Sequence, residues 1–266
     1  MPMRWGVKQA MGATGTYEAK RADSSVDSLW LTRQQSMFDS GGLAKLRQAT
    51  VLVAGVGGLG GAAATYLTTA GVGRLIILHE GVVEYPDLNR QTLMGWEGVG
   101  RKRIELAKKS LLRLNPHLIV DTIDARVTET DLDDWLTAVD FVIDARYTVE
   151  ERFRLNEICV ANHLPMMEVA MSGWEFYLFA VFPQQTPCLR CLFQESENWE
   201  GKKFPVLGSV SATAGTIAAT QVIKYLSGIE DTPQSTLYWH DSLNMQQLTI
   251  QVKRNPHCPV CGGVPL

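Results

Sequence analysis

Residues 50–60 read TVLVAGVGGLG, and this stretch decides the fold. Its first five residues are short and largely apolar, which is typical of a buried strand, and the small residues that follow the glycines predict a helix. Glycines in such a turn let phosphate oxygens approach the free N–H groups at the start of the helix. The predicted nucleotide-binding glycines are Gly55, Gly57, Gly58 and Gly60. Alone, the pattern also suits a dehydrogenase, and a tight glycine turn need bind nothing.

Strand and helix patterns alternate through the rest of the chain. Expected strands cover residues 75–78, 118–123, 141–143 and 164–170, and expected helices cover residues 62–70, 103–114, 131–136 and 150–161. Such alternation predicts right-handed βαβ units. Beyond these elements, residues 176–182 predict an antiparallel strand and residues 210–226 a long helix. We therefore expect an α/β fold: a Rossmann-like, mostly parallel sheet with helices on both faces and an antiparallel C-terminal extension.

One nucleotide-binding domain is expected over residues 29–266. Residues 1–28 are rich in small and polar residues without periodicity, which predicts a flexible N-terminal extension. An amphipathic segment at residues 30–38 leads toward the first strand, and the polar residues 195–205 predict a flexible crossover loop.

The composition narrows the functional class. The 266 residues are 45% hydrophobic, which is enough for a sizeable core. A formal net charge of -3 gives no general field for polyanions, so neither nucleic acid nor an acidic membrane surface is an expected partner. No apolar run approaches the roughly 20 residues that cross a bilayer, and no signal sequence is recognisable. We expect a cytoplasmic protein.

Four of the five cysteines form two Cys-x-x-Cys pairs, Cys188 with Cys191 and Cys258 with Cys261. Four thiolates predict a closed, tetrahedral Zn²⁺ site, which is structural rather than catalytic. A redox dithiol would need a cysteine at a helix N-terminus after a strand, and neither pair is expected there. A disulfide is the other alternative, and a reducing compartment disfavours it. The fifth cysteine, in an expected helix, is interpreted as an inert core thiol.

Polar residues follow the second expected strand, at the sheet edge where open α/β folds bind ligands. His79 and Glu80 end the strand, and Asp87 and Gln91 flank Arg90 a few residues later. Arg90 is the candidate phosphate contact, because a guanidinium holds two oxygens at once. A solvated loop is the alternative interpretation.

Arg101, Lys102 and Arg103 bring three cations to the start of an expected helix. The helix dipole disfavours cations there unless an anion lies between them. Lys102 and Arg103 are therefore further candidate nucleotide contacts, and a solvated basic turn is the alternative.

Taken in order, these motifs resemble the ThiF/MoeB/HesA family, the bacterial relatives of ubiquitin-activating enzymes. The resemblance covers roughly residues 30–263 and rests on Thr32-Arg33-Gln34, the glycine turn, Asn89-Arg90-Gln91, Leu114-Asn115-Pro116 and the two cysteine pairs. The runs 79–81, 89–94 and 206–211 are most similar to the HesA branch. That branch is associated with nitrogen fixation and nitrogenase cofactor maturation.

The resemblance implies an activity. Family proteins use ATP and Mg²⁺ to activate the C-terminal carboxylate of a small ubiquitin-like or sulfur-carrier protein as an acyl-adenylate. The resemblance also implies a homodimer in which Arg33 reaches the partner's nucleotide site. Arg33, Arg90 and Arg103 would be the catalytic cations that neutralise the displaced pyrophosphate. Residues 193–207 contain no cysteine, so a thioester or persulfide step is not expected.

Several positions depart from the family's pattern. His79 stands where the family has the acid that holds the ribose, and Arg103 stands where it has a lysine. Tyr147-Thr148 replaces an Asp-Asn pair whose aspartate serves Mg²⁺, and tyrosine cannot replace a hard carboxylate ligand at neutral pH. Asp144 lies three residues earlier and is carried forward as a candidate cofactor-binding residue.

Three functions therefore compete. The first is an adenylating enzyme that acts on a carrier protein. The second is a catalytically degenerate scaffold that binds a nucleotide, a carrier or a molybdenum species without turnover. The third is an NAD-dependent dehydrogenase, which the glycine turn and Glu80 support but which leaves the cysteine pairs unexplained.

Overall fold

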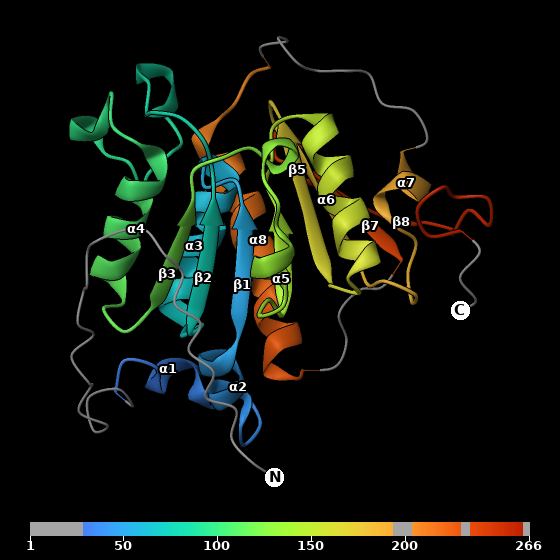
Figure 1. The fold of residues 1–266 in the computed structure, drawn as a ribbon, viewed down its shortest axis with the longest axis horizontal. Coiled ribbons are helices and arrows are strands. Elements are labelled where there is room, and N and C mark those ends of the chain that lie inside the picture. The colour runs from blue at the N-terminus through green and yellow to red at the C-terminus, as the bar shows by residue number, and fades with distance from the viewer. Residues whose placement is uncertain (1–28, 194–203, 230–234, 263–266) are drawn as a thin grey trace.

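A computed structural model describes residues 29–193, 204–229 and 235–262. Five parallel strands form one side of its sheet, from the edge strand β3 inward, in the spatial order β3-β2-β1-β4-β5 (Figure 1). All of them except β3 are almost fully buried, because helices cover both faces of the sheet. The parallel strands are β1 (Thr50–Ala54), β2 (Arg74–Leu78), β3 (Ile119–Ile123), β4 (Phe141–Asp144) and β5 (Met166–Ser172).

Three antiparallel strands extend the sheet beyond β5. They are β6 (Glu175–Val181), β7 (Thr236–Asp241) and β8 (Gln246–Gln251), and each pairs with the strand before it in the spatial order. The strand β8 forms the edge of the eight-stranded sheet opposite β3, and all six of its residues are exposed. The arrangement confirms the predicted α/β fold with an antiparallel C-terminal extension.

Helices cover the two faces of the sheet as separate layers (Figure 1). One layer packs on the larger apolar cluster and contains α2 (Gly42–Gln48), α3 (Gly58–Ala70), α4 (Arg103–Leu114) and α8 (Gly208–Ser227). The other layer packs on a second cluster and contains α5 (Asp133–Leu136), α6 (Val149–Ala161) and α7 (Leu189–Leu192). The helix α1 (Thr32–Gln35) and the 3₁₀ turns Tyr85–Asp87, Trp96–Gly98 and Val127–Glu129 complete the described elements.

The turn after β1 brings α3 unusually close to the strand. A Cβ atom on Gly60 would lie 1.7 Å from the carbonyl oxygen of Gly55, and one on Gly55 would lie 2.5 Å from the carbonyl oxygen of Ala145. Gly55 also has a φ of +98°, which side chains other than glycine rarely adopt. These two glycines therefore let the first turn of α3 lie directly over the end of β1.

Several boundaries differ from the sequence expectations. The helix after the glycine turn begins at Gly58 rather than residue 62, because the glycines themselves form its first turn. The amphipathic segment 30–38 contains only the four-residue α1, and a second short helix, α2, precedes β1. Strands β7 and β8 were not predicted. Residues 1–28 and most of the expected crossover loop lie outside the described residues.

No helix in the described ranges combines the length and apolarity that crossing a bilayer requires.

The close approach at Gly60 predicts a sharp effect of one methyl group. Gly60→Ala should lower the free energy of unfolding by about 3 kcal/mol or more, because the clash is with backbone. Gly61→Ala is the matched control: its Cβ would lie 3.3 Å from the Val56 carbonyl oxygen, and alanine favours the helix. The free energy of unfolding of that variant should stay within about 1 kcal/mol of the wild-type value. Urea unfolding measures both, and equal stability of the two variants would contradict the packing argument.

Candidate functional site

The glycine turn lies at the carboxyl edge of the parallel strands, and predicted site residues surround it. A Cβ on Gly58 would lie 3.1 Å from Arg90 Cγ and 2.5 Å from Ser211 Oγ at the start of α8. A Cβ on Gly57 would lie 3.7 Å from Gln91 Nε2 and 3.8 Å from His79 Cε1. The fold therefore brings Arg90, Gln91 and His79 to the N-terminus of α3, where free N–H groups attract anions.

Asp87 organises the basic side of this site. Its carboxylate accepts from Gln91 Nε2 (2.9 Å) and Arg103 Nη2 (2.7 Å), and it pairs with Arg90 Nη2 at 3.3 Å. Asp87 is 6% exposed, so these contacts are formed mostly away from water. Asp87 thus orients three predicted site residues, and its oxygens are occupied by donors of the chain itself.

His79 closes the other side of the turn as a neutral imidazole. Its Nδ1 accepts from the backbone N–H of Val56 at 2.9 Å, which places the remaining ring proton on Nε2. Burial lowers the pKa of His79 to about 3, and the charges of Arg146 and Arg103 act in the same direction. At neutral pH His79 therefore holds the glycine turn through a hydrogen bond and offers an N–H donor.

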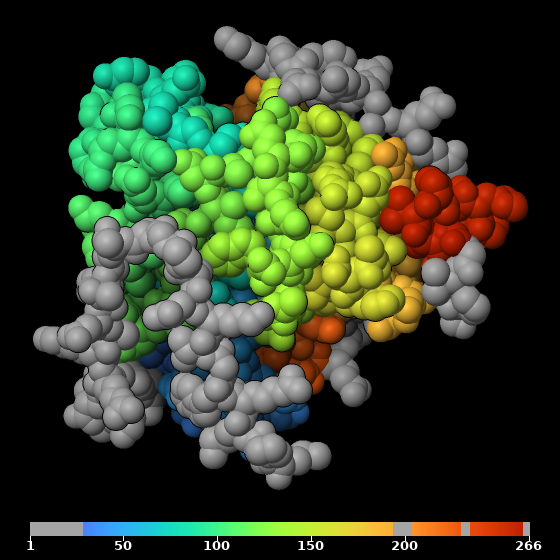
Figure 2. All heavy atoms as spheres, in the orientation of Figure 1, coloured from blue at the N-terminus to red at the C-terminus, as the bar shows by residue number. Residues whose placement is uncertain are grey.

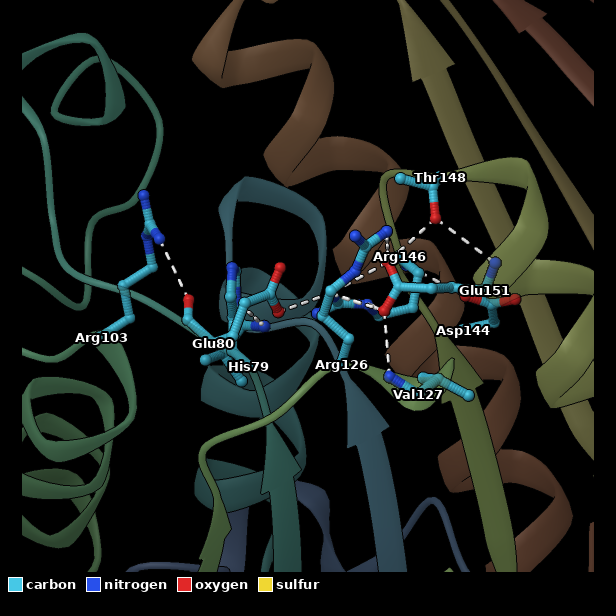
Figure 3. Close-up of polar contacts among 10 residues, drawn as sticks. His79, Glu80, Arg103, Arg126, Val127, Asp144, Arg146, Thr148 and Glu151 are labelled. Atoms are coloured by element: carbon cyan, nitrogen blue, oxygen red, sulfur yellow. Dashed lines mark hydrogen bonds and ion pairs between the residues drawn. The ribbon is translucent and has the colours of Figure 1, made fainter. Parts of the chain in front are cut away.

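An ion-pair network that the sequence reasoning missed joins the ends of β2 and β4 (Figure 3). Arg146, only 3% exposed, donates to Glu80 Oε2 at 2.6 Å and to Glu151 Oε1 at 2.9 Å. Glu151 also accepts from Thr148 Oγ1 and from the N–H of Val127. Burial alone would raise the pKa of Glu80, but Arg146 brings it below its ordinary value. Thr148 and Glu151 have capping-box spacing at the start of α6, a signal that could have indicated the network.

Two buried polar atoms in this region lack a partner among the described residues, namely Gln91 Oε1 and Arg103 Nε. Buried polar groups are normally hydrogen-bonded, so unpaired ones next to a glycine turn fit a site that a polar ligand completes. Arg90 and Arg103 supply the charge that a phosphate needs, and the first turn of α3 supplies N–H donors. The residues present therefore fit a nucleotide phosphate.

Other predicted residues lie apart from this cluster. Lys102 is exposed and pairs with Asp124 at 2.7 Å, so a carboxylate already balances it. Asp144 is fully buried and accepts from the N–H of Arg146 at 2.9 Å. Arg33 lies on α1, where its neighbour Gln34 donates to Ala70 at the far end of α3. Since α3 has 13 residues, Arg33 lies about 20 Å from the glycine turn of its own chain.

Tyr147 lies on the turn between β4 and α6, 45% exposed, with its ring stacked on Phe204 at 5.3 Å between centroids. The side chain that replaces the family's carboxylate is therefore held by an aromatic contact.

The four cysteine sulfurs lie within 4.8 Å of one another, where α7 meets the segment that follows β8. The Sγ atoms of Cys188 and Cys258 are 3.6 Å apart, and those of Cys191 and Cys261 are 3.4 Å apart. Tetrahedral Zn²⁺ with bonds of about 2.3 Å separates its sulfurs by about 3.8 Å, so the cluster fits this ion. Figure 2 shows the C-terminal segment that carries the second pair as a lobe at one end of the molecule.

The thiols of the cluster differ in acidity. Burial opposes ionisation of Cys258, but hydrogen bonds from the backbone of Cys261 and Val260 bring its pKa down to about 7. Burial and the neighbouring thiols raise the pKa of Cys188, and burial raises that of Cys191 to about 11. Contrary to expectation, Cys188 is the N-cap residue of a helix, α7. Its raised pKa nevertheless opposes the activated thiolate that a redox dithiol requires.

The sequence matches the profile of the ThiF family over residues 31–260. It is 40% identical over 234 residues to protein HesA of Leptolyngbya boryana, which covers 87% of this chain and 84% of that protein. The chain belongs to the ThiF family. This ThiF family member is also 34% identical over 241 residues to the Escherichia coli sulfur carrier protein ThiS adenylyltransferase, covering 90% of this chain and 92% of that one.

Solved structures share the fold of this ThiF family member at lower identity. The structure of Escherichia coli MccB has a TM-score of 0.79 and 21% sequence identity, and the match covers 92% of this chain and 75% of that chain. The structure of PaaA has a TM-score of 0.72 and 19% identity, with coverage of 88% and 86%. The predicted family is therefore confirmed by sequence, and the predicted architecture by the structures.

The sulfur cluster predicts that the protein binds about one Zn²⁺ per chain. Elemental analysis of protein expressed in the presence of zinc would measure this. Cys188→Ser should remove most of the metal and lower the melting temperature, because metal binding is coupled to folding. Cys159→Ser is the matched control: this cysteine is fully buried but lies outside the cluster, so zinc should be retained. Zinc-free protein with unchanged stability would contradict the assignment.

Proposed function

We propose that this protein adenylylates the C-terminal carboxylate of a small ubiquitin-like or sulfur-carrier protein with ATP. A carboxylate oxygen would attack the α-phosphorus of ATP, the α–β phosphate bond would break, and pyrophosphate would leave. The observation that carries this proposal is the glycine turn with Arg90 and Gln91 against it, in a chain that is 34% identical to a sulfur-carrier adenylyltransferase.

The chain's own residues have separate roles in this reaction. The N-terminal turn of α3 would bind phosphate oxygens through backbone N–H groups. Arg90 and Arg103, which Asp87 holds in place, would balance charge that develops on the leaving pyrophosphate. His79 would offer its Nε2–H to a ligand hydroxyl, and Glu80, kept ionised by Arg146, would accept from one. Mg²⁺ would add charge neutralisation when bound.

The position of Tyr147 supports a second candidate, a scaffold that binds nucleotide with little turnover. A phenol stacked on Phe204 supplies no carboxylate for Mg²⁺ at neutral pH. The buried carboxylate of Asp144 already accepts from Arg146. In this case binding would persist where catalysis is weak, and the ligand could be a nucleotide, a carrier protein or a molybdenum oxyanion.

We further propose a homodimer in which Arg33 serves the nucleotide site of the partner subunit. Arg33 is exposed on α1 and lies near the far end of α3 from its own glycine turn. The identity with HesA proteins supports a role in nitrogen fixation, with nitrogenase cofactor maturation as the proposed pathway.

Nucleotide binding tests the site directly. ATP at about 100 times its dissociation constant should raise the melting temperature by about 5 to 10 °C. Arg90→Ala should abolish this shift, since it removes the guanidinium packed on Gly58. Arg74→Ala is the matched control, because Arg74 makes an ion pair with Asp121 at the start of β2, at the other end of the strand. Equal loss of the shift in both variants would contradict the assigned site.

Pyrophosphate exchange with a candidate carrier protein then separates the two candidate functions. The double change Tyr147→Asp with Thr148→Asn should strengthen the Mg²⁺ dependence of ATP binding. Rapid exchange and tight, strictly Mg²⁺-dependent binding in the unchanged protein would exclude the scaffold.

Mixing two inactive variants tests the dimer. Arg33→Ala and Arg90→Ala should each lose pyrophosphate exchange, and random reassociation of their subunits should restore about a quarter of the wild-type sites. Half of the dimers would be mixed, and each mixed dimer would hold one site with both arginines. No recovery after mixing, or a monomer by light scattering at micromolar concentration, would contradict this arrangement.

A further inference from the structure

Asp144, one of the predicted cofactor-binding residues, faces a second buried acidic residue, Glu168, beneath α6. Asp144 ends β4, and Glu168 is its register partner on the parallel strand β5. Register partners project to the same face of a sheet from strands about 4.8 Å apart. Both residues have no exposed surface. Two carboxyl groups are thus held next to each other in the protein interior.

The hydrogen bonds of this pair leave one oxygen on each carboxyl group without a donor. Glu168 Oε1 accepts from Arg152 Nη1 on α6 and from the hydroxyl of Tyr177 on β6. Asp144 Oδ1 accepts from the N–H of Arg146. Glu168 Oε2 and Asp144 Oδ2 are buried and have no partner among the described residues. A donor is missing at the point where the two carboxyl groups meet.

The charges explain which donor is missing. Arg152 is the cation that contacts the pair, so two ionised carboxylates would leave one uncompensated negative charge in the interior. A metal ion would need several more oxygen ligands, and Arg152 would repel it. One proton removes the excess charge and bonds the two free oxygens together.

We propose that Asp144 and Glu168 share one proton between Asp144 Oδ2 and Glu168 Oε2 at neutral pH, leaving a single negative charge that balances Arg152. The groups that face the pair come from every element packed on it. They are Arg152 and Cys159 from α6 and Tyr177 from β6. Burial raises the pKa of Glu168 well above its usual range, and Asp144 acts in the same direction while Arg152 opposes it.

The shared proton gives Glu168 a positioning role. Asp144 holds the N–H of Arg146, and the carbonyl oxygen of Ala145 lies against Gly55 in the glycine turn. Arg152 also donates to the carbonyl oxygen of Val169. The shared proton therefore links the turn after β4 to β5 and α6. The proton would be present whether or not the protein adenylylates a carrier protein.

Linkage between protons and folding provides the test. An unfolded glutamate has a pKa of about 4.3, so at neutral pH unfolding releases the shared proton. The pair therefore stabilises the fold fully below that value, and its contribution falls as pH rises toward the raised pKa. Glu168→Gln supplies a permanent amide donor instead of the proton. Only the wild type releases this proton when it unfolds. The equilibrium constant for unfolding of Glu168→Gln, divided by that of the wild type, should therefore fall by about a hundredfold between pH 6 and pH 8.

Glu151→Gln is the matched control. Glu151, on α6, is also a buried glutamate, but donors already occupy both of its oxygens, namely Arg146, Thr148 and the N–H of Val127. Glutamine there places an amide against donors, and the variant should be destabilised by the same factor at both pH values. Asp144→Asn should behave like Glu168→Gln, because either amide can replace the proton. The double variant Asp144→Asn with Glu168→Gln should be less stable than either, since Arg152 then loses its counter-charge.

Infrared spectroscopy of the folded protein gives an independent readout. The wild type should show the carbonyl band of a protonated carboxylic acid at neutral pH, and both single variants should lack it. The proposal is overturned if that band is absent and the stability of Glu168→Gln relative to wild type does not change between about pH 6 and pH 8. Failure of both single variants to fold, while Glu151→Gln folds, would overturn it equally.

Discussion

The close contact between the end of β1 and the first turn of α3 is the constraint on which the rest of the site depends. Because Gly60 has no side chain, α3 can begin directly over the Gly55 carbonyl group. That position directs the free N–H groups of α3 toward the carboxyl edge of the sheet. It also lets the β4 turn, through Ala145, and the end of β2, through His79, contact the same few glycines.

The guanidinium groups at this edge are paired with carboxylates of the chain itself. Asp87 pairs with both Arg90 and Arg103, which leaves one positive charge in excess there, while Glu80 and Glu151 both pair with Arg146. Such pairing fixes long side chains in one geometry, so less ordering is left for a ligand to impose. It also means that a phosphate must compete with carboxylates for the guanidinium groups. The affinity for an anion therefore depends on two opposing effects, the ordering of the side chains in advance and the competition from the carboxylates.

The cysteine cluster is built from residues that take no part in the nucleotide edge. Cys188 is the N-cap of the short α7 and Cys191 lies within it. Asn156 on α6 accepts from the N–H of Leu189, and the second pair lies beyond β8. Metal bound there would fasten the C-terminal segment to α6 at the end of the sheet away from the glycine turn. A closed set of four thiolates has no open position for chemistry, which fits a structural role.

The sequence by itself determined the order of the parallel strands and the helices between them, the glycine turn, the two cysteine pairs and the family, because periodicity and spacing are local properties. Only the tertiary structure decided the pairing of charges. Glu80 and Arg146 are 66 residues apart in the chain, and no local pattern specifies that this guanidinium meets this carboxylate. The same holds for Asp144 and Glu168, which become neighbours only through the register of β4 on β5. Whether a side chain is ionised depends on those neighbours and on burial, which the fold alone supplies.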